Sequence, residues 1–393
     1  MSDPIVIVSA ARTPIGGLLG DFKEVSATEL GATAIRAVLA RSGVAAGTID
    51  EAYMGCVLSA GLGQAPARQA ALGGGLLEST ACTAVSKVCG SGLKAVMLAH
   101  DAILAGSAKY VIAGGMESMT NAPHLLLKAR HGHKMGNVAL QDHMFLDGLQ
   151  DAYDAGKLMG VFAEACAKKY SFTRKAQDDF AIASLERAKK ATANGHFAVE
   201  IAPVTVKSKK GDVVVSIDEQ PQKASPEKIP TLKPAFAADG TVTAANASSI
   251  SDGAAALMLM RLSDAEKLGL TPLARIVAHT SHAQEPAWFA TAPVSALSKL
   301  SEKTGWALKD VDLFEINEAF AVVVMAAMQD LQLPHEKVNI HGGACAMGHP
   351  IGASGARILV TLLSAMQQNG LKRGMASLCI GGGEAVAMAV ERL

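Results

Sequence analysis

The stretch SGLKAVMLAHDAILAGSAKYVIAGG, residues 91–115, decides the fold of this chain. Its apolar residues recur with helical spacing as far as Leu104, and Gly106 marks the end of that helix. A short strand, residues 110–113, follows and leads into a pair of glycines. Helices that alternate with strands in this way indicate parallel-type sheets with helices outside them.

A second stretch near the other end follows the same plan. It reads SGARILVTLLSAMQQNGLKRGMASLCIGGG, residues 354–383, and joins a helix that ends near Gly370 to a strand that enters three glycines. Residues 49–55 and 311–317 form another matching pair in the same order. Two ordered matches are harder to explain by chance than one. We therefore predict an α/β protein made of two similar halves packed together.

The middle of the chain differs from both halves. Residues 121–250 lack the glycine-turn repeat and contain charged helical stretches, such as one with Thr173 as candidate N-cap and Asn194 at its end. Residues 209–212 predict a hairpin turn between two valine-rich strands. We divide the chain into an N-terminal half, residues 1–120, an inserted loop domain, 121–250, a return to the first half, 251–271, and a C-terminal half, 272–393.

Composition and charge exclude several classes of function. Of the 393 residues, 50% are hydrophobic, and 36 Lys plus Arg balance 36 Asp plus Glu. A balanced chain has no electrostatic reason to bind nucleic acid or an anionic membrane. Local amides or a few cations must then hold any anionic ligand. We also expect no membrane span, because no long apolar run occurs.

The six cysteines point to a reducing compartment. They are spread along the chain without a C-x-x-C pair, so neither a zinc motif nor a dithiol motif is indicated. Residues 5–10 already form a predicted strand, so we expect no signal peptide. We therefore predict a cytoplasmic protein whose cysteines stay reduced.

Three glycine-rich turns carry Cys89, His349 and Cys379. Glycine lets the backbone approach a ligand closely and direct N–H groups at it. Cys89 precedes a predicted helix, where the helix dipole and free amides favour a thiolate nucleophile. Judged alone, either cysteine could be a small buried hydrophobe, and His349 could be a turn residue that bonds nearby backbone.

Taken together, the turns resemble those of the thiolase family, and within it the short-chain acetyl-CoA acetyltransferases. The resemblance runs from residues 5–14 to the last strand, and its motifs occur in family order. These motifs are the Cys89 turn, residues 114–118, residues 317–320, the His349 turn and the Cys379 turn. The resemblance implies two thiolase halves in a five-layered αβαβα arrangement, with the inserted loop domain covering coenzyme A.

The resemblance also implies a reaction and roles for residues. The reaction is a reversible ping-pong Claisen condensation of two acetyl-CoA to acetoacetyl-CoA and CoA. Cys89 would be acylated, His349 would take its proton, and Cys379 would remove the α-proton of the second acetyl-CoA. Asn317 would hold a water that forms one oxyanion hole with His349, and the N–H groups of Cys89 and Gly381 would form another.

Alternative roles remain open for the neighbouring residues Asn317 and Glu318, and His341 is a third candidate. Without the resemblance, Asn317 would be a helix N-cap. Glu318 could brace His349, or it could be an exposed carboxylate at a helix start. His341, where thiolases usually have Asn, is at most a supporting residue.

The expected contacts to coenzyme A follow from the resemblance too. They are Ser248, Ala235, Phe236, Ala319, Phe320, Phe289, Met159 and Leu158. Plain core packing is the alternative for the three phenylalanines. Leu158 stands where short-chain thiolases usually have His. Residues 216–233 lack the family's adenine-contacting arginine, and Gln222 or Lys223 falls nearby.

Other functions fit less well. A β-ketoacyl synthase would need two histidines in place of the Asn/Cys pair, and Cys379 argues against it. A nicotinamide-dependent dehydrogenase needs a G-x-G-x-x-G that residues 13–17 do not provide. A 3-ketoacyl-CoA thiolase of broader chain length and a catalytically silent thiolase-like scaffold remain as alternatives.

The resemblance sets expectations about ligands and assembly. We expect coenzyme A thioesters as substrates, no separate cofactor and no metal. Some relatives bind potassium through a tyrosine in residues 216–233, and this chain has none there. We expect a homotetramer, with a dimer as the alternative, and neither a nucleic acid nor a membrane partner.

Overall fold

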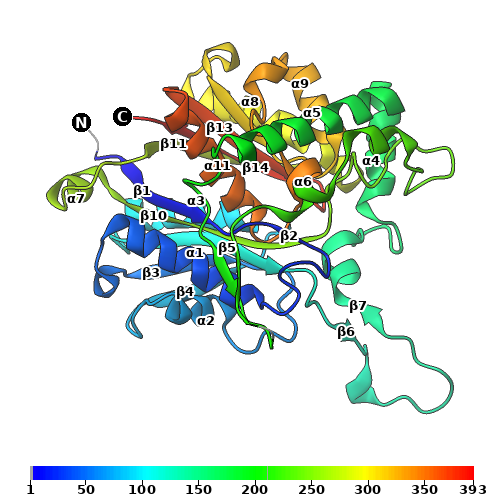
Figure 1. Cartoon of the computed structure of the whole chain (residues 1–393), viewed down its shortest axis with the longest axis horizontal. Coiled ribbons are helices and arrows are strands. Elements are labelled where there is room, and N and C mark those ends of the chain that lie inside the picture. Colours follow the sequence, from blue (N-terminus) through cyan, green and yellow to red (C-terminus); the bar gives the residue numbers. More distant parts are fainter. Residues whose placement is uncertain (1–2, 210) are drawn as a thin grey trace.

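The computed structural model describes residues 3–209 and 211–393, and within them ten strands form one mixed sheet (Figure 1). The strands are β1 (Ile5–Arg12), β2 (Gly16–Gly17), β3 (Glu51–Gly55), β4 (Ala81–Val85), β5 (Val111–Ser118), β10 (Ser251–Arg261), β11 (Ala274–Ala283), β12 (Leu313–Ile316), β13 (Arg373–Ile380) and β14 (Glu384–Glu391). They lie in the order β12-β13-β14-β11-β1-β10-β5-β3-β4, and β2 pairs with β10.

The strand pairing repeats itself in the two halves. In the first half β3 is parallel to β5, and β5, β10 and β1 then pair antiparallel in succession. In the second half β12 is parallel to β13, and β13, β14 and β11 follow in the same antiparallel order. This repetition confirms the predicted duplication. β1 also pairs with β11, at Val6–Arg275 and Ile7–Ala274, so backbone pairing continues from one half to the other.

Two helices fill the space between the halves, α3 (Ser91–Ala105) and α11 (Ser354–Gln368) (Figure 1). Their apolar side chains share one core cluster with side chains of β5, β10 and β13. The outer faces are covered by α1 (Ala27–Ser42) and α2 (Pro66–Gly73) on the first half, and by α8 (Ala292–Thr304) and α9 (Ala321–Leu331) on the second. Because the two halves of the sheet lie on either side of the central helices, the order helix, half-sheet, helix, half-sheet, helix is the five-layered α/β fold that we expected.

The two central helices meet at their N-terminal ends, where only glycine fits. A Cβ atom on Gly92 would lie 2.8 Å from the backbone nitrogen of Ala356, and one on Gly355 would lie 2.4 Å from that of Leu93. Real Cβ atoms essentially never come closer than 3.0 Å to such neighbours. The Ser-Gly pairs that open both helices in the sequence are therefore required by packing.

One helical stretch, Val88–Ala105, is long and apolar enough to cross a membrane, which differs from our expectation that the chain has no such run. It contains α3, which packs between the two halves of the sheet. Because most of its apolar side chains are buried among those of both halves, the stretch is explained as a core helix.

The inserted segment contains helices and two small hairpins. Its elements are β6 (His124–Leu125), β7 (Gln141–Asp142), the π-helix η3 (Met144–Leu149), α4 (Met159–Tyr170), α5 (Arg174–Ala193), β8 (Val204–Val206), β9 (Val213–Val215) and α6 (Glu219–Lys223). Thr173 caps α5 by accepting a hydrogen bond from the N–H of Ala176, and β8 pairs with β9, as predicted. The turn between them includes residue 210, which lies outside the described residues.

Short elements complete the chain. They are α7 (Leu262–Lys267), α10 (Ala344–Met347) and the 3₁₀ helices η1 (Ala46–Thr48), η2 (Ala129–His131), η4 (Pro226–Thr231), η5 (Pro286–Thr291), η6 (Leu308–Asp310) and η7 (His335–Lys337).

Arg12 at the end of β1 anchors the inserted segment to the first half. Its guanidinium donates to Glu200 at 2.5 Å and to the two oxygens of Asp218 at 2.7 and 2.9 Å. All three side chains are buried, so removing one partner would leave an uncompensated buried charge.

Candidate active site

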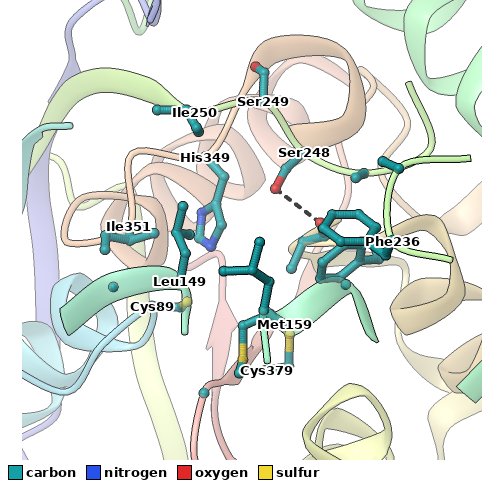
Figure 2. Close-up of a pocket in the computed structure, with 18 of the residues that line it drawn as sticks. Cys89, Leu149, Met159, Phe236, Ser248, Ser249, Ile250, His349, Ile351 and Cys379 are labelled. Carbon is teal, nitrogen blue, oxygen red and sulfur yellow. Dashed lines mark hydrogen bonds between the residues drawn. The ribbon is translucent and has the colours of Figure 1, made fainter. Parts of the chain in front are cut away.

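A cavity of 360 Å³ lies at the N-terminal ends of α3 and α11 (Figure 2). Cys89 precedes α3, His349 precedes α11, and Cys379 lies near the end of β13; all three line the cavity. The three glycine-rich turns that stood out in the sequence therefore face one space.

Cys89 lies in a tight turn that Ser91 fastens. The hydroxyl of Ser91 accepts a hydrogen bond from the N–H of Lys87 at 2.8 Å and donates one to the carbonyl of Val88 at 2.7 Å. Val88 has a φ of 44°, which is strained for a β-branched residue. Strain of this kind persists only where surrounding contacts enforce it, so the turn holds Cys89 in a defined place.

The thiol of Cys89 is protonated at neutral pH. Burial raises its pKa to about 11, and the N–H groups of Gly381 and of Cys89 itself, which favour the thiolate, offset only part of this effect. The helix start led us to expect a stabilised thiolate, but desolvation outweighs the amides. Cys89 therefore needs a base before it can act as a nucleophile.

His349 provides a neutral imidazole. Burial lowers its pKa to about 3, and the charge of Arg357 acts in the same direction. The hydroxyl of Ser354 lies 2.5 Å from Nδ1 and donates its own hydrogen to the carbonyl of Pro350 at 2.9 Å. Because a hydroxyl has one hydrogen, it must accept from Nδ1–H, which leaves Nε2 free to take a proton.

Asn317 is fully buried beside His349. Its amide nitrogen lies 3.4 Å from Nε2 and 3.5 Å from Nδ1 of the ring. The N-cap alternative is wrong, since α9 begins at Ala321 with Phe320 as its cap residue. Oδ1 of Asn317 has no partner among the described residues. Such a buried acceptor is costly unless a water or a substrate group bonds to it.

Glu318 follows neither of the two expectations. It is 1% exposed, and its carboxylate accepts hydrogen bonds from Ser184 at 2.7 Å, from Asn339 at 2.9 Å and from the N–H of Cys345 at 3.0 Å. These bonds tie the loop after β12 to α5 and to the loop before His349. Glu318 therefore supports the site through the backbone.

Cys379 is buried next to Cys89. Burial raises the pKa of Cys379 well above its usual value, and the nearby thiol of Cys89 acts in the same direction. Gly382 and Gly383 follow with φ of 90° and 85°, which glycine adopts readily. This turn brings the N–H of Gly381 toward the sulfur of Cys89.

The residues expected to contact coenzyme A line the same cavity. These are Leu158, Met159, Ala235, Phe236, Ser248, Phe289, Ala319 and Phe320. Ser248 donates to the carbonyl of Ala319 at 3.0 Å (Figure 2). Among the expected catalytic residues, Cys89, His349, Cys379 and Gly381 line the cavity, and Asn317 contacts it through His349.

Sequence reasoning missed several residues of the site. Further cavity residues are Phe145, Gly148, Leu149, Gly160, Ala244, Ala247, Ser249, Ile250 and Ile351. The segment of Phe145 and Leu149 has no periodic pattern that would have predicted this place. The place of Ser354 could have been predicted, because Ser354 occupies the same position in the second half as Ser91 in the first. His341 lies apart from the cavity wall and contacts the ring of His196, with centroids 4.7 Å apart.

Comparison with known proteins agrees with this geometry. Residues 5–263 match the family described as thiolase, N-terminal domain, and residues 270–392 match thiolase, C-terminal domain. The chain belongs to the thiolase family. The two matched parts of this thiolase meet around α7, between the last strand of the first half and the first strand of the second.

Thiolases similar to this chain come from bacteria and animals. The acetyl-CoA acetyltransferase of Thiocystis violacea is 50% identical over 100% of both chains. The cytosolic acetyl-CoA acetyltransferase of Mus musculus is 50% identical over 100% of this chain and 99% of its own. A solved acetyl-CoA acetyltransferase from Syntrophomonas wolfei superposes with a TM-score of 0.96 at 40% identity and covers 100% of each chain.

Proposed function

We propose that this chain is an acetyl-CoA C-acetyltransferase, which reversibly condenses two acetyl-CoA to acetoacetyl-CoA and CoA through an acetyl-Cys89 intermediate. The observation that carries the proposal is that two thiols, Cys89 and Cys379, and a neutral imidazole, His349, line one cavity. Hydrolysis needs one nucleophile, whereas C–C bond formation also needs a base for the α-carbon. The full-length relatives named acetyl-CoA acetyltransferase support the same activity.

The first half-reaction acylates Cys89. As its sulfur attacks the thioester carbonyl, the proton of Cys89 passes to Nε2 of His349, and CoA leaves with that proton. The N–H groups of Cys89 and Gly381, which already act on the sulfur, are placed to stabilise the oxyanion on the carbonyl bound to it.

The second half-reaction forms the C–C bond. Cys379 acts in its thiolate form, which is a minor form because burial raises the pKa of the thiol and which arises when the thiol gives its proton to solvent. This thiolate removes the α-proton of a second acetyl-CoA, and the resulting enolate attacks the acetyl carbonyl on Cys89. The C–S bond breaks, and the departing sulfur of Cys89 takes the proton from Cys379. The unpaired Oδ1 of Asn317 can hold a water that stabilises the enolate oxygen together with His349. The raised pKa of Cys379 makes its thiolate a strong base for a weakly acidic α-carbon.

The nucleotide end of coenzyme A would occupy a neighbouring hollow of 230 Å³. This hollow shares Ala244 and Ser249 with the catalytic cavity, and Lys223 and Lys228 line it. Lysines are common phosphate binders. We propose that these two take the place of the arginine that this segment lacks.

Assembly and compartment complete the proposal: a homotetramer in the cytoplasm, with a dimer as the alternative. β4 forms one edge of the sheet and is partly exposed. The inserted loop exposes large apolar side chains at Leu126, Met135 and Leu140. Free strand edges and exposed apolar surface are typical of association sites. The proposed reaction requires only thioester substrates, without a cofactor, a metal, a nucleic acid or a membrane.

Variants of the two thiols test the division of labour. After mixing with acetyl-CoA, the wild type should carry an acetyl group on Cys89 by mass spectrometry. Cys89→Ser should carry none, because a serine hydroxyl is far less ionised. Cys379→Ala should still be acylated but should not exchange the α-protons of acetyl-CoA in deuterated buffer.

A half-exposed thiol outside the cavity gives the control. Cys82→Ala, on β4, should retain both acylation and exchange. A stable acetyl adduct on another cysteine of the wild type, or exchange that survives Cys379→Ala, would contradict the assignment.

A further inference from the structure

A group of polar side chains lies near the end of α3 that is remote from Cys89. His100 and Asp101 are on α3, and His279 is on β11. Nδ1 of His100 lies 3.2 Å from Oδ1 of Asp101, and Nε2 of His279 lies 2.9 Å from the same oxygen. The three ligand-type atoms all lie within 4.8 Å of one another, and the two imidazole planes are almost perpendicular.

We propose that His100, Asp101 and His279 bind a divalent transition-metal ion, with Zn²⁺ as the best match. Two imidazoles and one carboxylate are a donor set that Zn²⁺ takes in proteins. Metal–ligand distances of about 2.1 Å put the ligand atoms of a tetrahedral site about 3.4 Å apart. The separations of 3.2 and 2.9 Å, both to Oδ1 of Asp101, are close to this spacing. The two ring nitrogens lie within 4.8 Å of each other, so the two imidazoles would move closer together to hold one ion.

The surroundings leave room for the remaining position of a tetrahedral ion. The three residues line a surface hollow of 400 Å³, and Asp101 is half exposed. Water can therefore reach the ion and complete its coordination. His100 and His279 are largely buried, so their rings have little freedom to turn away.

The protonation states suit metal binding. Burial lowers the pKa of both His100 and His279 despite the neighbouring carboxylate, so both rings are neutral near pH 7. Burial opposes ionisation of Asp101, but its hydrogen bonds with the two histidines hold its pKa below the usual value. Neutral imidazoles and an ionised carboxylate are the forms that coordinate metal.

One nearby cation opposes the ion. Lys303 donates to the carbonyl of His279 at 3.1 Å, and its charge contributes to the lowered pKa of both rings. Arg275 lines the same hollow, but its guanidinium is paired with Glu391. Removing the charge of Lys303 should therefore strengthen metal binding, an effect opposite in sign to the loss of a ligand.

Such an ion would join the two halves. α3 belongs to the first half and begins just after Cys89, whereas β11 is the first strand of the second half. An ion bound to the folded state and not to the unfolded chain raises the stability of the fold. Its role is structural, because the site lies outside the catalytic cavity.

Cobalt provides the probe. The whole protein, treated with a chelator and freed of it, is titrated with Co²⁺ and followed by the visible absorption of tetrahedral cobalt. We expect one such site per chain, displaced by Zn²⁺, together with a rise in melting temperature on adding Zn²⁺. His279→Ala and the milder Asp101→Asn should each weaken Co²⁺ binding by about tenfold or more, and Lys303→Gln should tighten it.

The matched control removes His131 and His133, which are exposed on the inserted loop. The double variant His131→Ala/His133→Ala should keep the absorption and the affinity. If the bands vanish with this double variant, or survive unchanged in both His279→Ala and Asp101→Asn, the proposal is wrong. If the wild-type protein binds no Co²⁺ at micromolar concentrations, the proposal is also wrong, and the three side chains form a hydrogen-bonded cluster only.

Discussion

Replacing Ser354 by Ala should slow the acylation of Cys89 while the protein stays folded. The hydroxyl of Ser354 accepts from Nδ1–H of His349 at 2.5 Å and thereby keeps Nε2 unprotonated. Without it, the buried Nδ1–H loses its acceptor, at a cost of about 1–3 kcal/mol. The other tautomer avoids this cost, but its Nε2 already carries hydrogen and cannot take the proton of Cys89.

The magnitude follows from that cost. A penalty of about 1–3 kcal/mol on the productive tautomer corresponds to an acylation rate about 5- to 150-fold lower. The assay is the rate of the pre-steady-state burst of CoA release after mixing enzyme with excess acetyl-CoA. KM should change little, because Ser354 does not line the cavity.

Ser364→Ala is the control, since Ser364 also lies on α11 and its hydroxyl accepts a hydrogen bond from Gln368 at 3.0 Å, away from His349. Both variants should melt within a few degrees of the wild type. Wild-type acylation in Ser354→Ala, or an equal loss in Ser364→Ala, would refute the tautomer argument.

Further outcomes are expected from the same geometry. Because burial raises the pKa of Cys89 to about 11, the thiolate fraction grows as pH rises toward that value. Alkylation of Cys89 by iodoacetamide should accelerate about tenfold per unit between about pH 7 and 9, and a plateau near pH 8 would contradict this. Leu158 and Phe289 make the cavity wall apolar, and a methylene in such a pocket is worth about 1–3 kcal/mol. Acetoacetyl-CoA should therefore have the highest kcat/KM, its 2-methyl analogue should be tolerated, and a preference for 3-ketohexanoyl-CoA would rule out the short-chain assignment. Lys228→Gln should raise KM for acetyl-CoA and leave kcat unchanged, and an unaltered KM would remove Lys228 from the nucleotide site. Light scattering should give a tetramer or a dimer, and a fully active monomer would contradict both.

Local signals predicted the parts of the fold that depend on neighbours in sequence. Thr173 capped its helix, and the valine-rich strands paired, because caps and hairpins are made by residues close in the chain. The sequence also showed the Ser-Gly pair at the start of both central helices, but it did not show why glycine is required there. That reason is a contact between Gly92 and Ala356 across the halves, which no local pattern encodes.

The sequence was enough to predict which residues form the candidate site, but not the pKa values of their side chains. Glycine turns carried Cys89 and Cys379, but the pKa of each thiol depends on burial by segments far along the chain. The cluster of His100, Asp101 and His279 was invisible for the same reason, since His279 comes from the other half. Sequence reasoning identifies reactive residue types, whereas long-range packing sets their charge states.

The duplication also explains how one structural plan yields two different catalytic ends. Ser91 and Ser354 are equivalent, each opening a central helix and each donating to a carbonyl in the turn before it. In the first half this bond fastens the strained turn that carries Cys89. In the second half the same hydroxyl also holds Nδ1 of His349. Because Gly92 and Gly355 let these helix starts touch, the nucleophile of one half and the base of the other share one cavity. The site is therefore a property of the interface between the halves, and neither half contains it alone.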